Sequence, residues 1–371
     1  MALISLVKRA AISGAVMAGV SVGAGVACTG ALAWFAVSTA RKKFPRKKLS
    51  PWPTDRSKGP LQGKVVLITG SSRGLGLALA EEFGGLGASL ALTARNAAEL
   101  ERARELLVSR LDAGEDEIFT TAGDLRDAEG ADRVIQETTE RFGQIDILVN
   151  NAGVITVGPI ESQSVEDFRD VMNSNFFSGL HCTLAALPQM LARGHGKIVN
   201  IASIGGKVAV PHLLPYTASK FAAVGFSEGL NSELRAKGIQ VTTVCPGLMR
   251  TGSHLNAVFT GDAAREYRWF SLGAGMPGLS TSARSAARKI VNATIAGKSE
   301  IAITPQAIMA ARLGNVCPTL TMRAMQAMNF ALPQSGGGDS HKHRGAEVRD
   351  LELRPATALG EAAARRYNQP R

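Results

Sequence analysis

The sequence predicts an α/β fold: one domain built on a doubly wound parallel sheet of about seven strands, with helices on both faces, behind an N-terminal membrane helix. Between residues 61 and 333, short runs of β-branched and aliphatic residues alternate with helix-compatible segments. Such alternation is typical of a parallel sheet that is covered on both sides. The chain has no internal repeat of solenoid length.

The expected elements follow one another along the chain. The expected strands are Val65–Thr69, Ser89–Thr93, Ile118–Thr121, Ile145–Val149, Lys197–Ile201, Gln240–Val244 and Glu300–Ile303. The expected helices are Leu75–Phe83, Ala97–Leu111, Ala128–Phe142, Val165–Leu191 and Thr217–Arg235. Ligands bind such sheets beyond the carboxyl ends of the strands, so functional residues are expected directly after each strand.

The N-terminal region predicts a membrane anchor. Residues 10–40 form a run of 31 without a charged side chain, and about 20 apolar residues suffice to cross a bilayer as a helix. A short basic N-terminus, residues 1–9, precedes the run, and a basic Pro-rich tether, residues 41–60, follows it. The heavier positive flank places everything after residue 41 on the cytoplasmic side. A cleaved signal peptide is the competing interpretation, which the long apolar run and its basic C-terminal flank disfavour.

The basic charge belongs to this leader. Of the net charge of +11, residues 1–58 contribute +9, because they hold ten Lys or Arg side chains against Asp55 alone. The rest of the chain is nearly neutral, so nucleic acid is not an expected partner. The four cysteines lie far apart and form no C-x-x-C pair, so neither a metal site nor a disulfide framework is expected.

A polar segment follows the expected catalytic domain, residues 61–333. Residues 334–371 are mostly polar and charged, which predicts a disordered tail carrying at most a short helix over Ala358–Arg366. Just before the tail, three methionines recur at helical spacing between Met322 and Met328. Their spacing predicts a helix that packs on the core or on the rim of the pocket.

A glycine-rich turn, TGSSRGLG, follows the first strand. Gly70, Gly74 and Gly76 let the backbone turn tightly and approach a diphosphate, while the next helix N-terminus offers amide donors and a positive dipole end. The spacing differs from the G-x-G-x-x-G of the longer-chain dinucleotide binders. On this motif alone, a glycine turn without a cofactor stays open.

The stretch TARN after the second strand indicates the cofactor. An acidic residue there suits the ribose 2′-hydroxyl of NAD(H), whereas a basic one suits the 2′-phosphate of NADP(H). Arg95 stands at this position and Arg73 lies in the glycine loop, so NADP(H) is the preferred cofactor and NAD(H) the alternative. Two surface arginines without a ligand are the competing interpretation.

The stretch PYTASKFAAVGF places Tyr216 and Lys220 four positions apart at the start of a predicted helix. Residues at that spacing share one helix face, so the phenol and the ammonium are expected to be neighbours. A nearby cation lowers the pKa of a tyrosine, which suits a general acid and base near neutral pH. Alone, such a pair also arises by chance.

Together these motifs resemble the short-chain dehydrogenase/reductase family in its common form of about 250 residues. The matching motifs are the glycine loop Thr69–Gly76, NNAG at 150–153, Ser203, the Tyr216-x-x-x-Lys220 pair and CPG at 245–247. They occur in the family's order, each after the corresponding strand, over residues 62–303. The resemblance implies a Rossmann-like fold and hydride transfer between a nicotinamide cofactor and a carbonyl or alcohol.

The resemblance also implies catalytic roles. Tyr216 would protonate the carbonyl oxygen, Ser203 would hydrogen-bond the same oxygen, and Lys220 would lower the Tyr216 pKa and bind the nicotinamide ribose. Asn175 aligns with the family's fourth catalytic residue, which holds a water in the proton relay. Ser178 stands three residues on, where a small glycine is usual.

Further cofactor contacts carry over by position. Asp124 and Leu125 match the pair beside the adenine, residues 151–153 match the loop along the adenosine ribose, and Thr251 matches the residue that binds the carboxamide. For Thr251, an ordinary loop hydroxyl is the competing interpretation. The full set expected to bind the cofactor is Gly70, Ser72, Arg73, Gly74, Leu75, Gly76, Arg95, Asp124, Leu125, Asn151, Ala152, Gly153, Tyr216, Lys220, Pro246, Gly247 and Thr251.

Specificity in this family comes from the segment after the sixth strand, here residues 252–280. Its apolar side chains either line a pocket or pack the core, and they suit a lipid-like carbonyl or alcohol. The expected function is an NADP(H)-dependent oxidoreductase on such a substrate, with a 3-oxoacyl reductase as the alternative enzyme. A non-catalytic NADPH-binding sensor or scaffold at a membrane is the alternative of another class. Helices 165–191 and 217–235 correspond to the family's dimer-forming pair, so a homodimer or homotetramer is expected.

Overall fold

The computed structural model describes residues 59–276, 279–333, 341–348 and 354–369. The predicted membrane anchor lies outside these residues, as do the basic N-terminus and all but the last two residues of the tether. Within the described residues, no helix is both long and apolar enough to span a bilayer. The described residues all belong to one compact unit that begins at Pro53.

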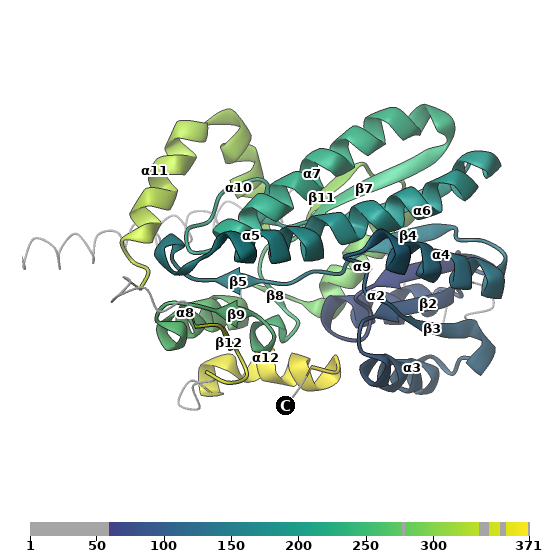
Figure 1. The fold of residues 1–371 in the computed structure, drawn as a ribbon, viewed down its shortest axis with the longest axis horizontal. Coiled ribbons are helices and arrows are strands. Elements are labelled where there is room, and N and C mark those ends of the chain that lie inside the picture. Colours follow the sequence, from purple (N-terminus) through teal and green to yellow (C-terminus); the bar gives the residue numbers. More distant parts are fainter. Residues whose placement is uncertain (1–58, 277–278, 334–340, 349–353, 370–371) are drawn as a thin grey trace, which may run out of the picture. The chain divides into compact units, whose positions relative to one another are not determined.

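A seven-stranded sheet runs through the centre of the domain, and every pair of neighbouring strands is parallel (Figure 1). The strand order is β11-β7-β6-β4-β1-β2-β3, and it reverses at β1, so β1 and β4 flank the crevice in which such folds bind ligands. All seven predicted strands are confirmed. They are β1 (Val65–Thr69), β2 (Ser89–Ala94), β3 (Ile118–Ala122), β4 (Ile147–Asn150), β6 (Gly196–Ile201), β7 (Ile239–Cys245) and β11 (Glu300–Ala302).

The composition of the strands explains their burial. Every residue of β1 and β4 is buried. A parallel strand is covered on both faces, so a near-continuous run of Val, Ile and Leu replaces the alternation of a one-sided strand. The main apolar core joins sheet and helices through residues that include Leu67, Val134, Leu148, Met190 and Ile198.

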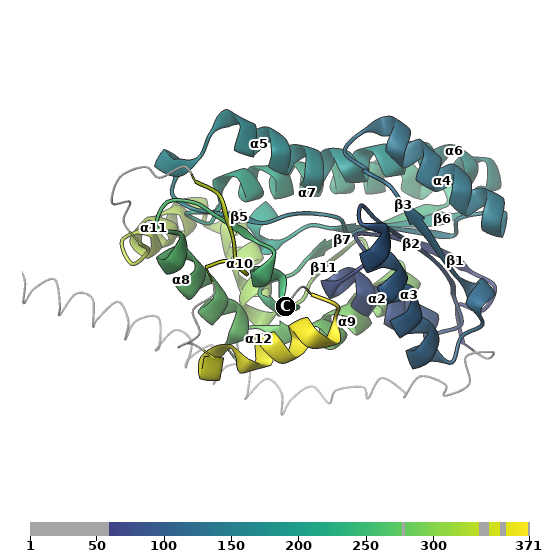
Figure 2. The same cartoon turned by 60° about the horizontal axis from the view of Figure 1, so that its bottom comes forward.

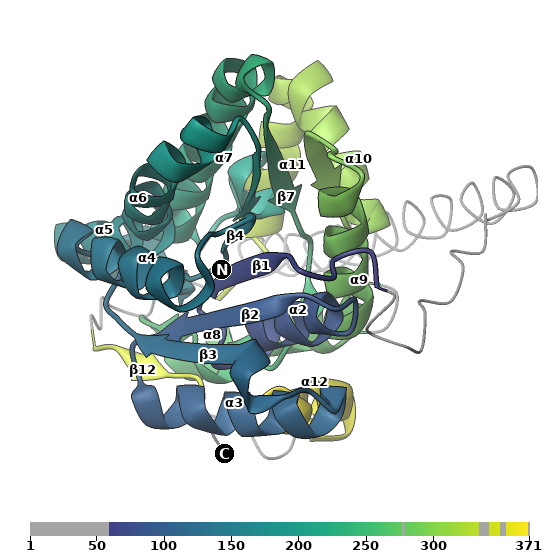
Figure 3. The ribbon, with the colours of Figure 1, turned by 90° about the vertical axis from the view of Figure 1, so that its right-hand side faces the viewer.

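Helices cover the two faces of the sheet in separate groups (Figure 3). One group consists of α4 (Ala128–Phe142), α6 (Ser178–Arg193) and α7 (Leu214–Leu234). The other consists of α2 (Gly74–Gly84), α3 (Ala97–Leu111) and α9 (Ala283–Ile295). This is the doubly wound arrangement that the alternating sequence pattern predicts.

One predicted helix is interrupted. The sequence predicts a continuous helix over residues 165–191, but the structure has α5 (Val165–Met172), a π-helical turn over Asn173–Phe177 and then α6. A π-turn inserts an extra residue into the helical ladder and is frequent at functional sites. Here it carries Asn175, one of the predicted catalytic residues.

Short strands and one helix build a second, smaller layer from segments that follow β4 and β7, and β12 of the C-terminal region joins it by pairing with β9. Aromatic side chains of this layer, Phe259, Tyr267 and Phe270, are buried in a satellite core of their own. Most apolar residues of the predicted specificity segment therefore pack a core. The elements of the layer are β5 (Thr156–Val157), β8 (Met249–Arg250), β9 (Val258–Phe259), α8 (Ala263–Gly275), β10 (Thr281–Ser282) and β12 (His343–Arg344).

Helices α10 (Pro305–Val316) and α11 (Pro318–Asn329) project as a hairpin after β11 (Figure 1). The prediction that the methionine helix packs on the core or the pocket rim is wrong, because no residue of α11 is buried. Leu320 and Met322 are 61% and 60% exposed. Short helices owe most of their stability to packing. Within the described chain, α11 packs against α10 and leaves its other apolar side chains exposed.

The described parts of the C-terminal region, residues 341–348 and 354–369, are folded where the sequence predicts a disordered tail. Strand β12 pairs antiparallel with β9, and α12 (Arg354–Arg366) lies along α8 and reaches the α3 side of the domain (Figure 2). The predicted short helix is part of α12. Tyr367 and Ala364 are only 3% and 4% exposed. A low overall hydrophobicity predicts disorder, but here a few buried apolar side chains and hydrogen bonds to the domain hold the segment.

Candidate active site

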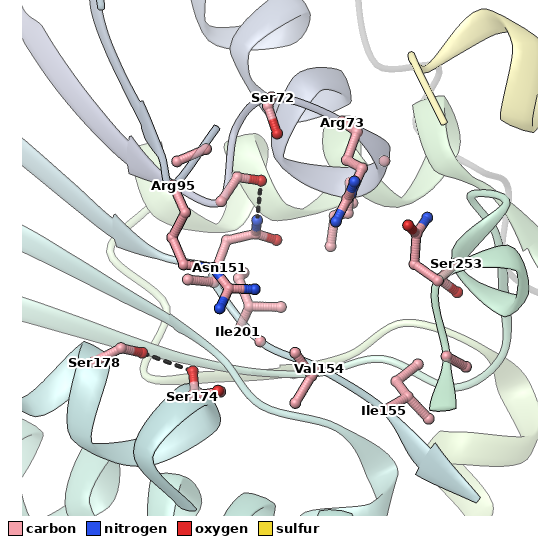
Figure 4. A pocket seen from close by; sticks show the side chains of 18 of the residues that line it. Ser72, Arg73, Arg95, Asn151, Val154, Ile155, Ser174, Ser178, Ile201 and Ser253 are labelled. Atoms are coloured by element: carbon pink, nitrogen blue, oxygen red, sulfur yellow. Dashed lines mark hydrogen bonds between the residues drawn. The ribbon is translucent and has the colours of Figure 1, made fainter. Parts of the chain in front are cut away.

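A cavity of about 560 Å³ lies at the carboxyl ends of the central strands (Figure 4). It brings together residues that are far apart in the sequence. The predicted site residues that line it are Gly70, Ser72, Arg73, Gly74, Leu75, Arg95, Asp124, Leu125, Asn151, Ala152, Gly153, Tyr216, Lys220 and Thr251.

The glycine loop is shaped by contacts that a side chain would prevent. A Cβ on Gly70 would lie 2.9 Å from Cα of Ala152, and Gly70 has a φ of 61°, in the left-handed region. A Cβ on Gly76 would lie 2.2 Å from the carbonyl oxygen of Gly70. The Asn151 side chain donates to the carbonyls of Thr69 and Gly70, at 2.9 and 3.1 Å. The loop is therefore held open as a backbone cradle in front of the α2 N-terminus, which fits a diphosphate.

Arginines stand at the end of the cavity beyond β1 and β2. Nη1 of Arg73 lies 3.0 Å from Oε2 of Glu99, so one predicted phosphate ligand is already ion-paired. Burial lowers the pKa of Arg73, and the Glu99 carboxylate opposes this effect. Arg95 is exposed and has no acidic partner among the described residues. Arg95 is thus the more accessible cation.

Asp124 lies beyond the end of β3, where the resemblance places the adenine. The Arg126 side chain donates to its two carboxylate oxygens at 3.0 and 2.9 Å. This hydrogen bonding lowers the pKa of Asp124. The carboxylate is therefore already neutralised by a partner on its own loop.

Lys220 is buried on the catalytic helix α7. Its Nζ donates to the carbonyl oxygen of Ile201, at 3.0 Å, and lies 5.7 Å from the centre of the Tyr216 ring. Burial lowers the pKa of Lys220 to about 8. The phenol and the ammonium are neighbours, as their spacing predicts.

Tyr216 shows the opposite pKa direction from the one predicted. Burial raises the pKa of Tyr216, and a hydrogen bond with Ser203 opposes that rise without cancelling it. The expected lowering of the Tyr216 pKa by Lys220 is wrong for this structure, because desolvation of the phenolate is the largest cause of its shift and Lys220 does not contribute to it. Ser203 is oriented by its loop, since its Oγ accepts from the backbone of Gly205 at 3.0 Å.

Asn175 is held by the chain next to the cavity. Its Oδ1 accepts from the backbone N–H of Val154 at 2.7 Å, and its Nδ2 donates to Ser219 Oγ at 2.9 Å. A Cβ on Gly153 would lie 2.8 Å from Asn175 Oδ1 and 3.6 Å from Lys220 Nζ. Gly153 thus lets Asn175 and Lys220 approach the same point.

Ser178, which departs from the family's usual glycine, is accommodated within the helix. Its Oγ donates to the carbonyl of Ser174 at 2.8 Å, one turn earlier (Figure 4). The substitution therefore leaves the π-turn and Asn175 in place.

Some predicted residues do not line the cavity, and their binding roles stay predictions. Asn175, Ser203 and Gly76 are not among its lining residues, and Gly76 packs against the carbonyl of Gly70. The Pro246 carbonyl accepts from the backbone of Ile204 at 2.8 Å, next to Ser203, and Gly247 packs against Thr304. Val208, Leu213 and Leu214, which lie between Ser203 and Tyr216 in the sequence, do not line the cavity either.

Two lining residues, Arg344 and Gln369, come from outside residues 62–303, the segment that carries the predicted motifs. Both come from the region that was expected to be disordered. Neither lies in a recognisable motif, so no sequence signal could have found them.

The strand order, the glycine cradle at the reversal point and a Tyr–Lys pair in the same cavity define a dinucleotide-dependent oxidoreductase. The profile of the short chain dehydrogenase family matches residues 64–258. The chain belongs to this family, whose members bind NAD(H) or NADP(H) and act on small molecules.

Individual relatives agree with this assignment. A dehydrogenase/reductase SDR family protein 7-like from Anopheles gambiae is 35% identical over 288 residues, which are 76% of this chain and 89% of that protein. The 3-oxoacyl-[acyl-carrier-protein] reductase FabG of Haemophilus influenzae is 36% identical over 192 residues, 52% of this chain and 76% of that protein. A solved short-chain dehydrogenase from Streptomyces avermitilis is 31% identical with a TM-score of 0.61, over 71% of this chain and 97% of that one.

Proposed function

We propose that this protein interconverts a carbonyl and an alcohol on an apolar substrate, with NADP(H) as the hydride carrier. The observation that carries the proposal is that Tyr216 and Lys220 line the same cavity as the glycine loop and Arg95. Acid–base groups and a phosphate-binding cradle in one cavity suit hydride transfer coupled to proton transfer.

Proton transfer is assigned to the chain's own residues. When bound, the cofactor supplies or accepts the hydride. Tyr216 gives its proton to the carbonyl oxygen during reduction, and Ser203, which shares a hydrogen bond with Tyr216, holds the same oxygen. The Lys220 ammonium stabilises the phenolate that remains. In the oxidation direction the same proton moves back.

The preference for NADP(H) rests on charge. Arg95 follows β2 without an acidic partner in the described chain, and Arg73 lies across the same end of the cavity (Figure 4). A planar guanidinium binds a phosphate through two hydrogen bonds, whereas it gains little from a ribose hydroxyl.

The apolar substrate is supported by the wall near Tyr216. The apolar residues that line the cavity there are Val154, Ile155, Met249, Ala257 and Val258. None of these can hydrogen-bond a sugar or a phosphate through its side chain, so burying a polar substrate against them costs free energy.

Membrane attachment on the cytoplasmic side is part of the proposal. It rests on the apolar run of residues 10–40 and on the exposed apolar side chains of the α10–α11 hairpin. Between residues 305 and 330 the chain has two arginines and no acid, which suits an anionic headgroup layer. A lipid-like substrate would then reach the enzyme from the bilayer.

Self-association as a homodimer or homotetramer is also proposed. Large apolar side chains are exposed on the helices predicted to form the interface. They are Phe177, Leu184, Leu191 and Phe221. Size-exclusion chromatography with light scattering would give the oligomeric state directly.

The experiment that tests the function is a cofactor-oxidation assay of the compact unit, residues 53–371. NADPH or NADH is supplied with long-chain aldehydes, steroid ketones, 3-oxoacyl thioesters or small polar ketones. Turnover with NADPH on the apolar carbonyls supports the proposal. Turnover restricted to small polar ketones contradicts the apolar-substrate part, and turnover with NADH alone contradicts the cofactor part.

A 3-oxoacyl reductase is the second candidate. It is favoured by the 36% identity to the FabG of Haemophilus influenzae. In the same assay, turnover of the 3-oxoacyl thioesters alone would select it.

A further inference from the structure

The C-terminal segment contacts the glycine loop directly. The backbone N–H of Gly74 donates to the carbonyl of Tyr367 at 2.9 Å. The side-chain amide of Asn368 donates to the carbonyls of Ser72 and Glu99, at 2.9 and 3.1 Å. The end of the chain is thus tied to one wall of the cofactor cavity.

Gln369 also reaches the opposite wall. Its Nε2 donates to the carbonyl of Thr251 at 2.9 Å, and its Oε1 accepts from Asn256. The same Nε2 would lie 3.0 Å from a Cβ on Gly74. One side chain therefore spans the gap between the α2 N-terminus and the loop after β7.

The local sequence explains this path. Asn368 has a φ of 54°, the left-handed conformation that asparagine tolerates well and that commonly ends a helix. This turn directs Gln369 back toward the cavity. Helix α12 is fixed because Tyr367 is buried and Ala364 packs against Gly252, where a Cβ on the glycine would lie only 2.6 Å from Cβ of Ala364.

Arg344 enters the same cavity from β12. Pairing of β12 with β9 places Arg344 opposite Val258, and both residues line the cavity. Its positive charge contributes to lowering the pKa of Arg73. Its guanidinium has no acidic partner among the described residues. The two acids that line the cavity, Glu99 and Asp124, are already paired with other arginines.

We infer that residues 341–348 and 354–369 form a strap that closes over the bound dinucleotide, with Arg344 and Gln369 contacting its diphosphate. The inference rests on the proposed function, since it needs a dinucleotide in this cavity. Gln369 stands beside the α2 N-terminus, where a diphosphate binds. Arg344 supplies a cation that, unlike Arg73 of the glycine loop, is not already paired with an acid in the described chain. The strap must move for the cofactor to leave.

The test measures NADPH binding and release in the full-length protein. Arg344→Ala and Gln369→Ala are compared with Arg365→Ala, which removes a charge from α12 where Arg365 pairs with Glu361 and does not line the cavity. We expect each strap variant to raise the NADPH dissociation rate about tenfold, as for the loss of a charge-assisted hydrogen bond, and the control to stay near wild type. NADPH dissociation rates of Arg344→Ala and Gln369→Ala that equal the rate of the control variant would overturn the inference.

Hydrogen exchange gives a second readout that needs no substitution. With NADPH bound, the amides of residues 360–369 and of Gly74 are expected to exchange more slowly than in the free protein. Faster exchange would mean that the cofactor displaces the segment. Unchanged exchange would mean that the cofactor does not contact the segment. Either result overturns the inference. If the wild-type protein binds neither NADPH nor NADH, the proposed function fails as well, whereas normal binding with unaffected variants removes the strap alone.

Discussion

Arg73 and Glu99 form an ion pair inside the candidate cofactor cavity, with 3.0 Å between the guanidinium and the carboxylate. Both side chains are partly exposed, at 33% and 22%. Arg73 is one of the two residues expected to receive the 2′-phosphate of NADP(H). Glu99 therefore competes with that phosphate for the same cation.

Replacing Glu99 by glutamine should improve the use of NADPH. We expect Glu99→Gln to lower the KM for NADPH about threefold, because a partly exposed ion pair is worth about 0.5–1 kcal/mol and its loss frees Arg73. Steady-state kinetics with NADPH and NADH would measure the change. Glu101→Gln, which removes an acid paired with Arg104 on the same helix, is the matched control. A higher KM for NADPH would show instead that Glu99 positions Arg73.

Arg95→Ala should reduce the affinity for NADPH selectively. Arg95 has no competing acid in the described chain, so a phosphate contact there is lost in full, and we expect the KM for NADPH to rise about tenfold. The KM for NADH should change little, because NADH has no 2′-phosphate. Arg102→Ala, on the exposed side of α3, controls for net charge. An equal rise in KM for NADPH and NADH would mean instead that Arg95 contacts a part of the cofactor that the two molecules have in common.

Tyr216→Phe should stop turnover and spare cofactor binding. The substitution removes the proton donor, which typically contributes about 10²–10⁴ to the rate, while the ring keeps its packing. Turnover and the Kd for NADPH, the latter by fluorescence titration, would be measured on the same preparation. If the variant also keeps the wild-type phenotype in cells, the protein acts there as a sensor or scaffold and not through catalysis.

The sheet could be predicted because its signals are local. Each strand is a short apolar run, as in Val65–Thr69, and each side of the crevice is marked by a motif directly after a strand. The neighbourhood of Tyr216 and Lys220 follows from helix geometry alone. Neither inference needs long-range contacts.

The remaining features depend on contacts that no local pattern encodes. The upward pKa shift of Tyr216 comes from its burial in the folded domain, which no motif around Tyr216 reveals. Arg344 and Gln369 reach the cavity only because strand pairing and the packing of Tyr367 hold a polar segment in place. The composition of such a segment predicts disorder because few of its residues are apolar. Composition does not reveal that those few apolar side chains pack into sites on the folded domain.

Glu266→Ala should destabilise the second, smaller layer, to which α8 belongs. Glu266 is buried, and its carboxylate contacts His212 Nδ1 at 2.7 Å and accepts from Trp269 Nε1 at 2.6 Å. Removing it leaves the buried His212 and the half-buried Trp269 without their partner, and we expect the free energy of unfolding to fall by about 3 kcal/mol. Urea denaturation would measure the loss. Glu166→Ala, at an exposed pair with Arg169, should change it by under about 1 kcal/mol.

Lys220→Met should abolish turnover and yet stabilise the fold at neutral pH. Burial lowers the pKa of Lys220 to about 8, against an ordinary value of 10.5. Below pH 8 the folded protein therefore holds a charged ammonium away from water, and methionine fills a similar volume without that cost. We expect the free energy of unfolding at pH 7 to rise by about 1–3 kcal/mol, net of the lost hydrogen bond to Ile201.

The sign of the pH dependence makes this prediction specific. Between about pH 8 and 10.5 the unfolded wild-type chain binds a proton at Lys220 that the folded chain does not, so the stability contribution of this residue rises with pH. The advantage of Lys220→Met should therefore shrink steadily across that window. Thermal unfolding at several pH values would follow it, with Lys237→Met, at an exposed position, as the control. An advantage that stays constant up to pH 10.5 would mean that the amine is not desolvated, and Lys220 would then act as an ordinary charged ammonium at neutral pH.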